Sequence, residues 1–196
     1  MASKKTKVVD KWKAKTWYSV LAPALFENKE IAEIVASEDK KLVDRIVKVS
    51  MMEATGTGSQ NAIFTTLKFR ITEVKGTNAH TRIIGYEIMP TYLKTLIRRN
   101  KSLIQSSVPV KTKEDGIVLV KVIAITASKV SQNTKKNLRN ALVEEVKKST
   151  DGMTYDQLMQ EIIYGRLTSK LFGRLKAITP MKRVEVRKSE LKETFK

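Results

Sequence analysis

The sequence contains no cysteine and a single histidine, His80. Without cysteine the chain can form neither disulfides nor thiolate metal sites, and this composition fits a reducing compartment. One imidazole cannot build a site from paired histidines, so we expect no bound metal. His80 follows a turn inside a predicted strand, where a surface histidine is the plain interpretation.

Long apolar runs are also missing. No stretch of 18 apolar residues occurs, and no apolar signal region follows Met1, so we expect a soluble protein that is neither exported by a cleaved signal nor bound to a membrane. Gly56 and Gly58 form a lone Gly-x-Gly without the third glycine or the Gly-Lys-Ser/Thr of a nucleotide-binding loop. The sequence therefore predicts no cofactor.

Catalytic arrangements are equally absent at the level of the sequence. Ser37-x-x-Lys40 and Ser189-x-x-Lys192 match a Ser-Lys spacing, but such pairs arise by chance in a chain rich in lysine. The carboxylates show no pairing that separates an acid from a base. We therefore expect no catalytic residues and no enzyme.

Positive charge is what the sequence has in excess. It carries 38 Lys and Arg against 20 acidic residues, a net charge of +18 with a pI of about 10.0. This excess repels itself unless a polyanion neutralises it. Nucleic acid is the first candidate, because its dense phosphates release counterions on binding. An anionic membrane surface is the second, but no strongly amphipathic basic helix with large aromatic residues favours it.

Most of the β-structure is expected within residues 61–127. Leu67, Phe69 and Ile71 alternate with basic and polar residues, as in a strand with one buried face. Residues 79–89 follow a glycine turn as a second strand. Residues 117–127 are apolar on both faces, as in the middle of a sheet or barrel. We therefore predict an α+β fold in which helices flank an antiparallel β-barrel core.

The composition divides the chain into three parts. Residues 1–14 form a basic N-terminal arm, 15–190 a single β-barrel domain with helices at about 134–176, and 191–196 a polar tail. Thr154 and Gln157 have the spacing of a capping box at the start of one helix. Residues 31–35 are interpreted as one helical turn.

Candidate RNA-binding cations fall in three clusters. The arm is either a solvated tail or a segment that orders on RNA, where Trp12 could stack on a base or pack on the domain, and the overall charge favours the second interpretation. The cations at the end of the helix of about ten residues that Pro90 opens suit the helix dipole or a phosphate equally well. The third cluster lies in a basic loop and helix start with few apolar residues, which favours RNA contact. The candidates are Lys4, Lys5, Lys7, Lys11, Lys13 and Lys15; Arg98 and Arg99; and Lys129, Lys135, Lys136 and Arg139.

Several short motifs together resemble one family, the archaeal and eukaryotic small-subunit ribosomal protein S-three-A, also called eukaryotic-type S-one. The resemblance covers about residues 7–190, and its first two motifs are the more specific. The motifs are Lys15-Thr16-Trp17-Tyr18, Ala22-Pro23-Ala24-Leu25-Phe26, Lys68-Phe69-Arg70, Val110-Lys111-Thr112 up to Ile117, the basic segment after Ala127, and Val184-Glu185-Val186-Arg187-Lys188. The basic insert after Ala127 is shorter than in the eukaryotic pattern and no long C-terminal extension follows, so the chain looks like the archaeal form.

This resemblance implies a structural protein of the small ribosomal subunit, located in the cytoplasm. It implies a place on the platform beside the 3′ end of the ribosomal RNA and the messenger exit. The expected partners are the small-subunit ribosomal RNA and neighbouring ribosomal proteins, with messenger RNA at the exit as a further candidate. Two alternatives remain open: a free-standing RNA- or DNA-binding protein such as a chaperone, and, less favoured, an enzyme acting on RNA.

Overall fold

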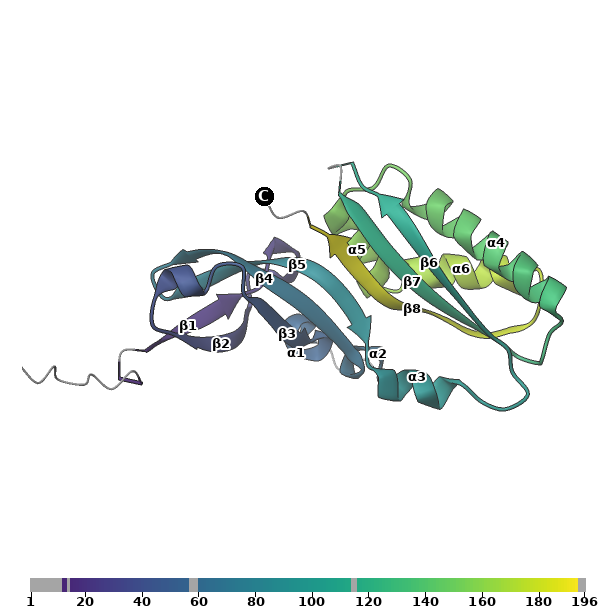
Figure 1. Ribbon diagram of the computed structural model, residues 1–196, viewed down its shortest axis with the longest axis horizontal. Coiled ribbons are helices and arrows are strands. Elements are labelled where there is room, and N and C mark those ends of the chain that lie inside the picture. Colours follow the sequence, from purple (N-terminus) through teal and green to yellow (C-terminus); the bar gives the residue numbers. More distant parts are fainter. Residues whose placement is uncertain (1–11, 14, 57–59, 114–115, 194–196) are drawn as a thin grey trace, which may run out of the picture.

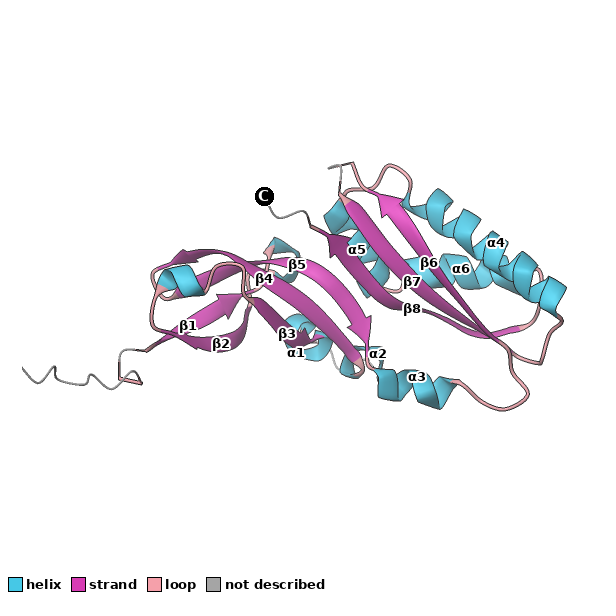
Figure 2. Cartoon of the chain, in the orientation of Figure 1, coloured by secondary structure: helices cyan, strands magenta, loops and turns pink. Residues whose placement is uncertain are grey.

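The computed structural model describes residues 12–13, 15–56, 60–113 and 116–193. The chain folds into strands and helices arranged in two lobes (Figures 1 and 2). The strands are β1 (Thr16–Leu21), β2 (Glu30–Ala36), β3 (Ile46–Ser50), β4 (Thr65–Lys75), β5 (Asn78–Ile88), β6 (Leu103–Lys111), β7 (Ile117–Thr126) and β8 (Met181–Lys192). The helices are α1 (Met51–Thr55), α2 (Gln60–Ile63), α3 (Pro90–Leu96), α4 (Gln132–Thr150), α5 (Tyr155–Ile163) and α6 (Arg166–Lys176), with 3₁₀ turns at Ala24–Phe26 and Asp39–Lys41.

One sheet of eight strands runs through both lobes. Its order is β2-β1-β5-β8-β7-β6, and β4 pairs with both β5 and β3. The first lobe holds β1 to β5 with α1 and α2, and the second holds β6 to β8 with α4, α5 and α6 on one side of the strands (Figure 1). The predicted α+β class and the β4–β5 hairpin are confirmed.

The predicted barrel is wrong. No pairing among the described residues joins the outer strands β2, β3 and β6 to one another, so the sheet is open. The apolar character of β7 has another cause, because both of its faces are covered without closure. Val118 and Val120 face the core beneath the helices, and Ile123 and Ile125 are also buried. A strand between two partners and two apolar layers needs apolar residues on both faces, whether the sheet closes or not.

Residues 31–35 are also extended rather than helical, because they pair with β1 as part of β2. The helix starts are better predicted. Thr154 and Gln157 form the expected capping box of α5, with both reciprocal hydrogen bonds present. Ser131 caps α4 by accepting a hydrogen bond from the Thr134 amide at 3.2 Å. These caps satisfy amides that a helix start would otherwise leave without partners.

The two lobes meet at a short seam between β5 and β8. Among the described residues, the pairing of β5 with β8 is limited to residues 85–87 and 188–190. Gly85 permits this approach, since a Cβ at this position would lie 2.9 Å from the carbonyl oxygen of Ser189. The strands would have to separate to admit any side chain at residue 85.

A row of alternating charges crosses the same seam. Lys68 pairs with Glu87 at 2.6 Å, Lys188 pairs with Glu190, and Lys121 of β7 lies 3.3 Å from Glu190. The hydrogen bond from Lys68 is the main cause that lowers the pKa of Glu87. Burial alone would raise the pKa of Glu190, but Lys188 and then Lys121 lower it below its ordinary value. Both carboxylates are therefore held ionised, Glu87 by lysines of both lobes and Glu190 by two lysines of the second lobe.

Candidate RNA interface

Acidic residues are absent from three long stretches of the sequence, residues 88–113, 116–143 and 162–184. The fold brings one part of each stretch to the same place. The α3–β6 loop, the β7–α4 loop with the start of α4, and the start of β8 lie together at one end of the second lobe (Figure 1). We call this region, residues 97–102, 127–139 and 174–183, the basic end.

Hydrogen bonds around Thr126 fix two of these loops. Thr126 is fully buried, and its hydroxyl accepts a hydrogen bond from the amide of Ser102 at 2.9 Å. The same hydroxyl donates to the carbonyl oxygen of Ser128 at 2.6 Å. The hydroxyl of Ser102 accepts from the amide of Val130 at 3.2 Å. The loops that carry basic residues are thus anchored to the end of a buried strand.

The third stretch joins through the backbone and brings cations together. The amide of Ala127 donates to the carbonyl oxygen of Pro180 at 2.9 Å, immediately before β8. Beyond it, the amines of Lys182 and Lys101 lie close together, and Arg98 is near enough to disfavour the charge of Lys182 further. The neighbouring Lys101 is the main cause that lowers the pKa of Lys182. Like charges held together in this way favour an anionic ligand.

Most of the predicted RNA-binding residues in the described chain are exposed. Helix α3 ends at Leu96, so Arg98 and Arg99 lie beyond it in the loop rather than in its last turn. Lys129 lies in the β7–α4 loop, with Lys135 half-buried in the first turn of α4. The remaining exposed candidates are Lys136 and Arg139. The structure thus places the second and third predicted clusters in one region.

The predicted arm belongs to a different part of the molecule. Lys13 and Lys15 are exposed, and the amine of Lys15 lies 3.9 Å from the centre of the Trp12 ring. They precede β1, at the end of the first lobe that is far from the basic end (Figure 1). The other arm candidates, Lys4, Lys5, Lys7 and Lys11, lie outside the described residues. Any RNA contact by the arm would therefore be separate from contact at the basic end.

Lys101 and Lys182 were not among the predicted candidates. The two lysines belong to segments far apart in the sequence, and only the fold brings them close together. The absence of acids from three stretches is the sequence signal that could have found them. A surface built only from such stretches has no carboxylates with which its cations can pair.

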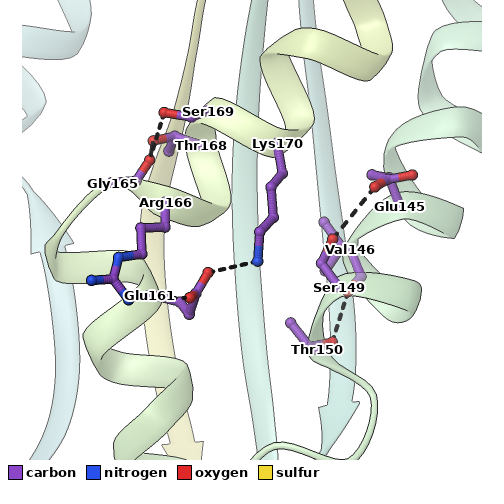
Figure 3. A network of polar contacts seen from close by, with 10 residues as sticks. All are labelled: Glu145, Val146, Ser149, Thr150, Glu161, Gly165, Arg166, Thr168, Ser169 and Lys170. Atoms are coloured by element: carbon purple, nitrogen blue, oxygen red, sulfur yellow. Dashed lines mark hydrogen bonds and ion pairs between the residues drawn. The ribbon is translucent and has the colours of Figure 1, made fainter.

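Other cations of the second lobe are neutralised within the fold. Figure 3 shows Glu161 of α5 accepting a hydrogen bond from Lys170 at 2.9 Å, with Arg166 at 3.8 Å. Gly165 lies beside them at the N-cap of α6, and its carbonyl oxygen accepts a hydrogen bond from the Thr168 hydroxyl at 2.6 Å. These cations of the first turns of α6 thus share a carboxylate, unlike Lys101 and Lys182.

A cavity of about 450 Å³ lies where the two lobes and α3 meet. Phe64 and Tyr92 stack on its wall with ring centres 4.8 Å apart. Burial raises the pKa of Tyr86 to about 12, so its phenol stays protonated. Glu185 is held by Arg183 at 2.7 Å. The other charged lining residues are Glu27 and Lys29.

Within the described ranges, no group of three or more His, Asp or Glu side chains is arranged to hold a metal. No described helix combines the length and apolar character needed to cross a membrane.

Comparison with known proteins identifies the family. Residues 3–194 match the model of the ribosomal S3Ae family. Three similar proteins are each named small ribosomal subunit protein eS1. The one from Staphylothermus marinus is 35% identical, over 97% of this chain and 89% of the relative. The one from Halorubrum lacusprofundi is 34% identical over 90% and 81%, and the one from Saccharolobus islandicus 32% identical over 97% and 91%. The chain belongs to the ribosomal S3Ae family.

Proposed function

We propose that this protein is a structural constituent of the small ribosomal subunit and binds ribosomal RNA through its basic end. The observation that carries the proposal is the convergence of three acid-free stretches on loops anchored by Thr126 and Ser102. Family membership and the relatives' names support the ribosomal role, which is structural rather than enzymatic. Its location is then the ribosome, in the cytoplasm.

The arrangement suits recognition of RNA by shape and backbone. Base edges in duplex RNA are hard to reach, so proteins contact phosphates and ribose hydroxyls across its surface. Arg98, Arg99 and Arg139 can each hold a phosphate with two hydrogen bonds, whereas Lys129 and Lys136 act as point charges. Because the loops are anchored before RNA arrives, little conformational entropy is lost on binding.

The finer placement stays a prediction. A position on the platform, beside the 3′ end of the ribosomal RNA and the messenger exit, follows from the family resemblance, and so does contact with neighbouring ribosomal proteins. Binding of messenger RNA at the exit has the same basis. We also propose that residues 15–190 form a single domain and that the N-terminal arm binds RNA.

Fractionation of a cell lysate on a sucrose gradient tests the function. The wild-type protein should sediment with small subunits at moderate salt, whereas a free-standing RNA binder would stay near the top. Replacing Lys129, Lys135, Lys136 and Arg139 with alanine should lower incorporation of the protein into small subunits, because the basic end then lacks four of its cations.

A matched variant removes four exposed lysines of the first lobe, Lys29, Lys40, Lys41 and Lys75. It loses the same charge and should incorporate normally. Equal losses in both variants would mean that net charge alone drives incorporation. Normal incorporation of the first variant would show that its four substituted residues do not belong to the RNA interface.

A further inference from the structure

Strand β8 departs from simple alternation at two places. Its inward residues are Met181, Val184, Val186 and Ser189, which are all buried. Met181 and Val184 are three positions apart, and so are Val186 and Ser189, whereas strict alternation would give two. The register with β7 shifts at the same points, so that one residue of β8 has no partner at each shift. These are β-bulges, which add a residue to one strand and redirect side chains.

Each bulge holds a cation. The residues without partners are Lys182, between the positions opposite Thr126 and Ile125, and Arg187, between those opposite Val122 and Lys121. Both are exposed. In strict alternation, one member of Lys182-Arg183 and one of Arg187-Lys188 would point into the core, where an unpaired charge is very costly. The bulges instead turn both members of each basic pair outward.

The outward side of β8 therefore carries two basic pairs on the face opposite α5. The inward side is marked by Ser189, whose hydroxyl contacts the sulfur of Met159 in α5 at 3.7 Å. Arg183 and Lys188 are engaged by Glu185 and Glu190. Neither Lys182 nor Arg187 forms an ion pair with any acid in the described part of the chain. Each bulge thus presents a cation that no acid of the described residues neutralises.

We propose that β8 is a second RNA-binding element, in which the bulge residues Lys182 and Arg187 each contact a phosphate of the ribosomal RNA backbone. The proposal rests on the proposed function and extends the interface beyond the loops. Lys182 lies in the basic end beside Lys101, so a backbone bound there can continue along β8 to Arg187. The two residues lie about 16 Å apart at the usual rise of a strand. An acidic protein segment is the competing ligand.

The test measures the affinity of the full chain for purified small-subunit ribosomal RNA between about 50 and 200 mM salt, the range over which phosphate contacts dominate. The variant carries Lys182→Gln and Arg187→Gln. Losing two phosphate contacts should weaken binding and reduce the log–log salt slope by about 1.4 to 1.8 in magnitude. Each single substitution should give half of this change. A conservative variant, Lys182→Arg with Arg187→Lys, should have the same log–log salt slope as the wild type.

A charge-matched control carries Lys40→Gln and Lys75→Gln in the first lobe, and its slope should equal that of the wild type. Thermal unfolding of every variant checks the fold. If the double variant is unfolded, the salt slopes of the two single variants test the proposal instead. An unchanged slope in the double variant, with normal wild-type binding, would overturn the role of β8 and leave the proposed function intact. An unchanged slope with poor incorporation into subunits would assign these cations to a protein neighbour and also overturn it. Absence of the wild-type protein from small subunits would instead refute the proposed function.

Discussion

Replacing Thr126 with valine should separate anchoring of the basic loops from their charge. Valine has nearly the same shape but no hydroxyl, so the amide of Ser102 and the carbonyl of Ser128 lose a partner. Ser102 is only 4% exposed, and little water can reach its amide. No cation is removed by this substitution.

The magnitude follows from the buried amide. A buried donor left without its acceptor costs about 1–3 kcal/mol. For a chain of this size, each kcal/mol lowers Tm by about 2–4 °C, so a loss near the middle of that range predicts a fall of about 4–8 °C. Looser loops must also be ordered when RNA binds, so affinity should fall. The salt slope should stay constant, because it counts phosphate contacts rather than their rigidity.

Thermal unfolding and salt-dependent RNA binding measure the two effects. The control is Thr112→Val, which removes a hydrogen bond to the Gly116 carbonyl oxygen at 3.0 Å, at the opposite end of the β6–β7 hairpin. It should leave RNA affinity unchanged. The reasoning fails if Thr126→Val binds RNA as tightly as the wild type despite a lower Tm, since the loops would then need no anchor.

Three further changes test the fold. Gly85→Val should destabilise the protein by about 1–3 kcal/mol in denaturant unfolding, because its side chain meets a backbone oxygen of β8. Leu142→Ala should cost about 2–5 kcal/mol by the same measurement, because Leu142 is fully buried in α4. The lowered pKa values of Glu87 and Glu190 add stability that is present above their ordinary value of 4.5 and lost as the pH falls through the folded pKa. The variant Glu87→Gln with Glu190→Gln should therefore lose less stability between about pH 5 and pH 3 than the wild type, and an identical loss would show that these pairs contribute nothing.

Local features were predictable from the sequence because their causes are local. The alternation of Leu67, Phe69 and Ile71 indicates a strand with one buried face, whichever strand is its partner. Together with the glycine turn that follows, it predicts the β4–β5 hairpin. The capping box of Thr154 and Gln157 needs only four consecutive residues. Residues 31–35 show the limit, since a short apolar run fits either a helical turn or a strand until β1 supplies a partner.

Closure of the sheet and the shape of the interface depend on contacts between distant segments. An apolar strand such as β7 is expected in a barrel and in an open sheet covered by helices, so composition cannot distinguish them. The Lys101–Lys182 contact joins segments about eighty residues apart in the chain. The bulges of β8 arise where core packing of Val184, Val186 and Ser189 fixes which residues face inward. The sequence alone shows that the cations are consecutive there, but it does not show that both side chains of each pair point outward.

The seam between the lobes has a consequence for the order of folding during synthesis. Strands β1 to β5 pair among themselves over their full lengths, so the first lobe can form while the rest of the chain is still being made. The second lobe cannot, because β7 needs β8 as a partner and residues 181–192 are synthesised after all three long helices. Until then β7 exposes an unpaired apolar edge, and the third part of the basic end, which includes Lys182, is not yet in place. The RNA-binding surface is thus completed only when β8 arrives, which couples competence for RNA binding to the finished chain.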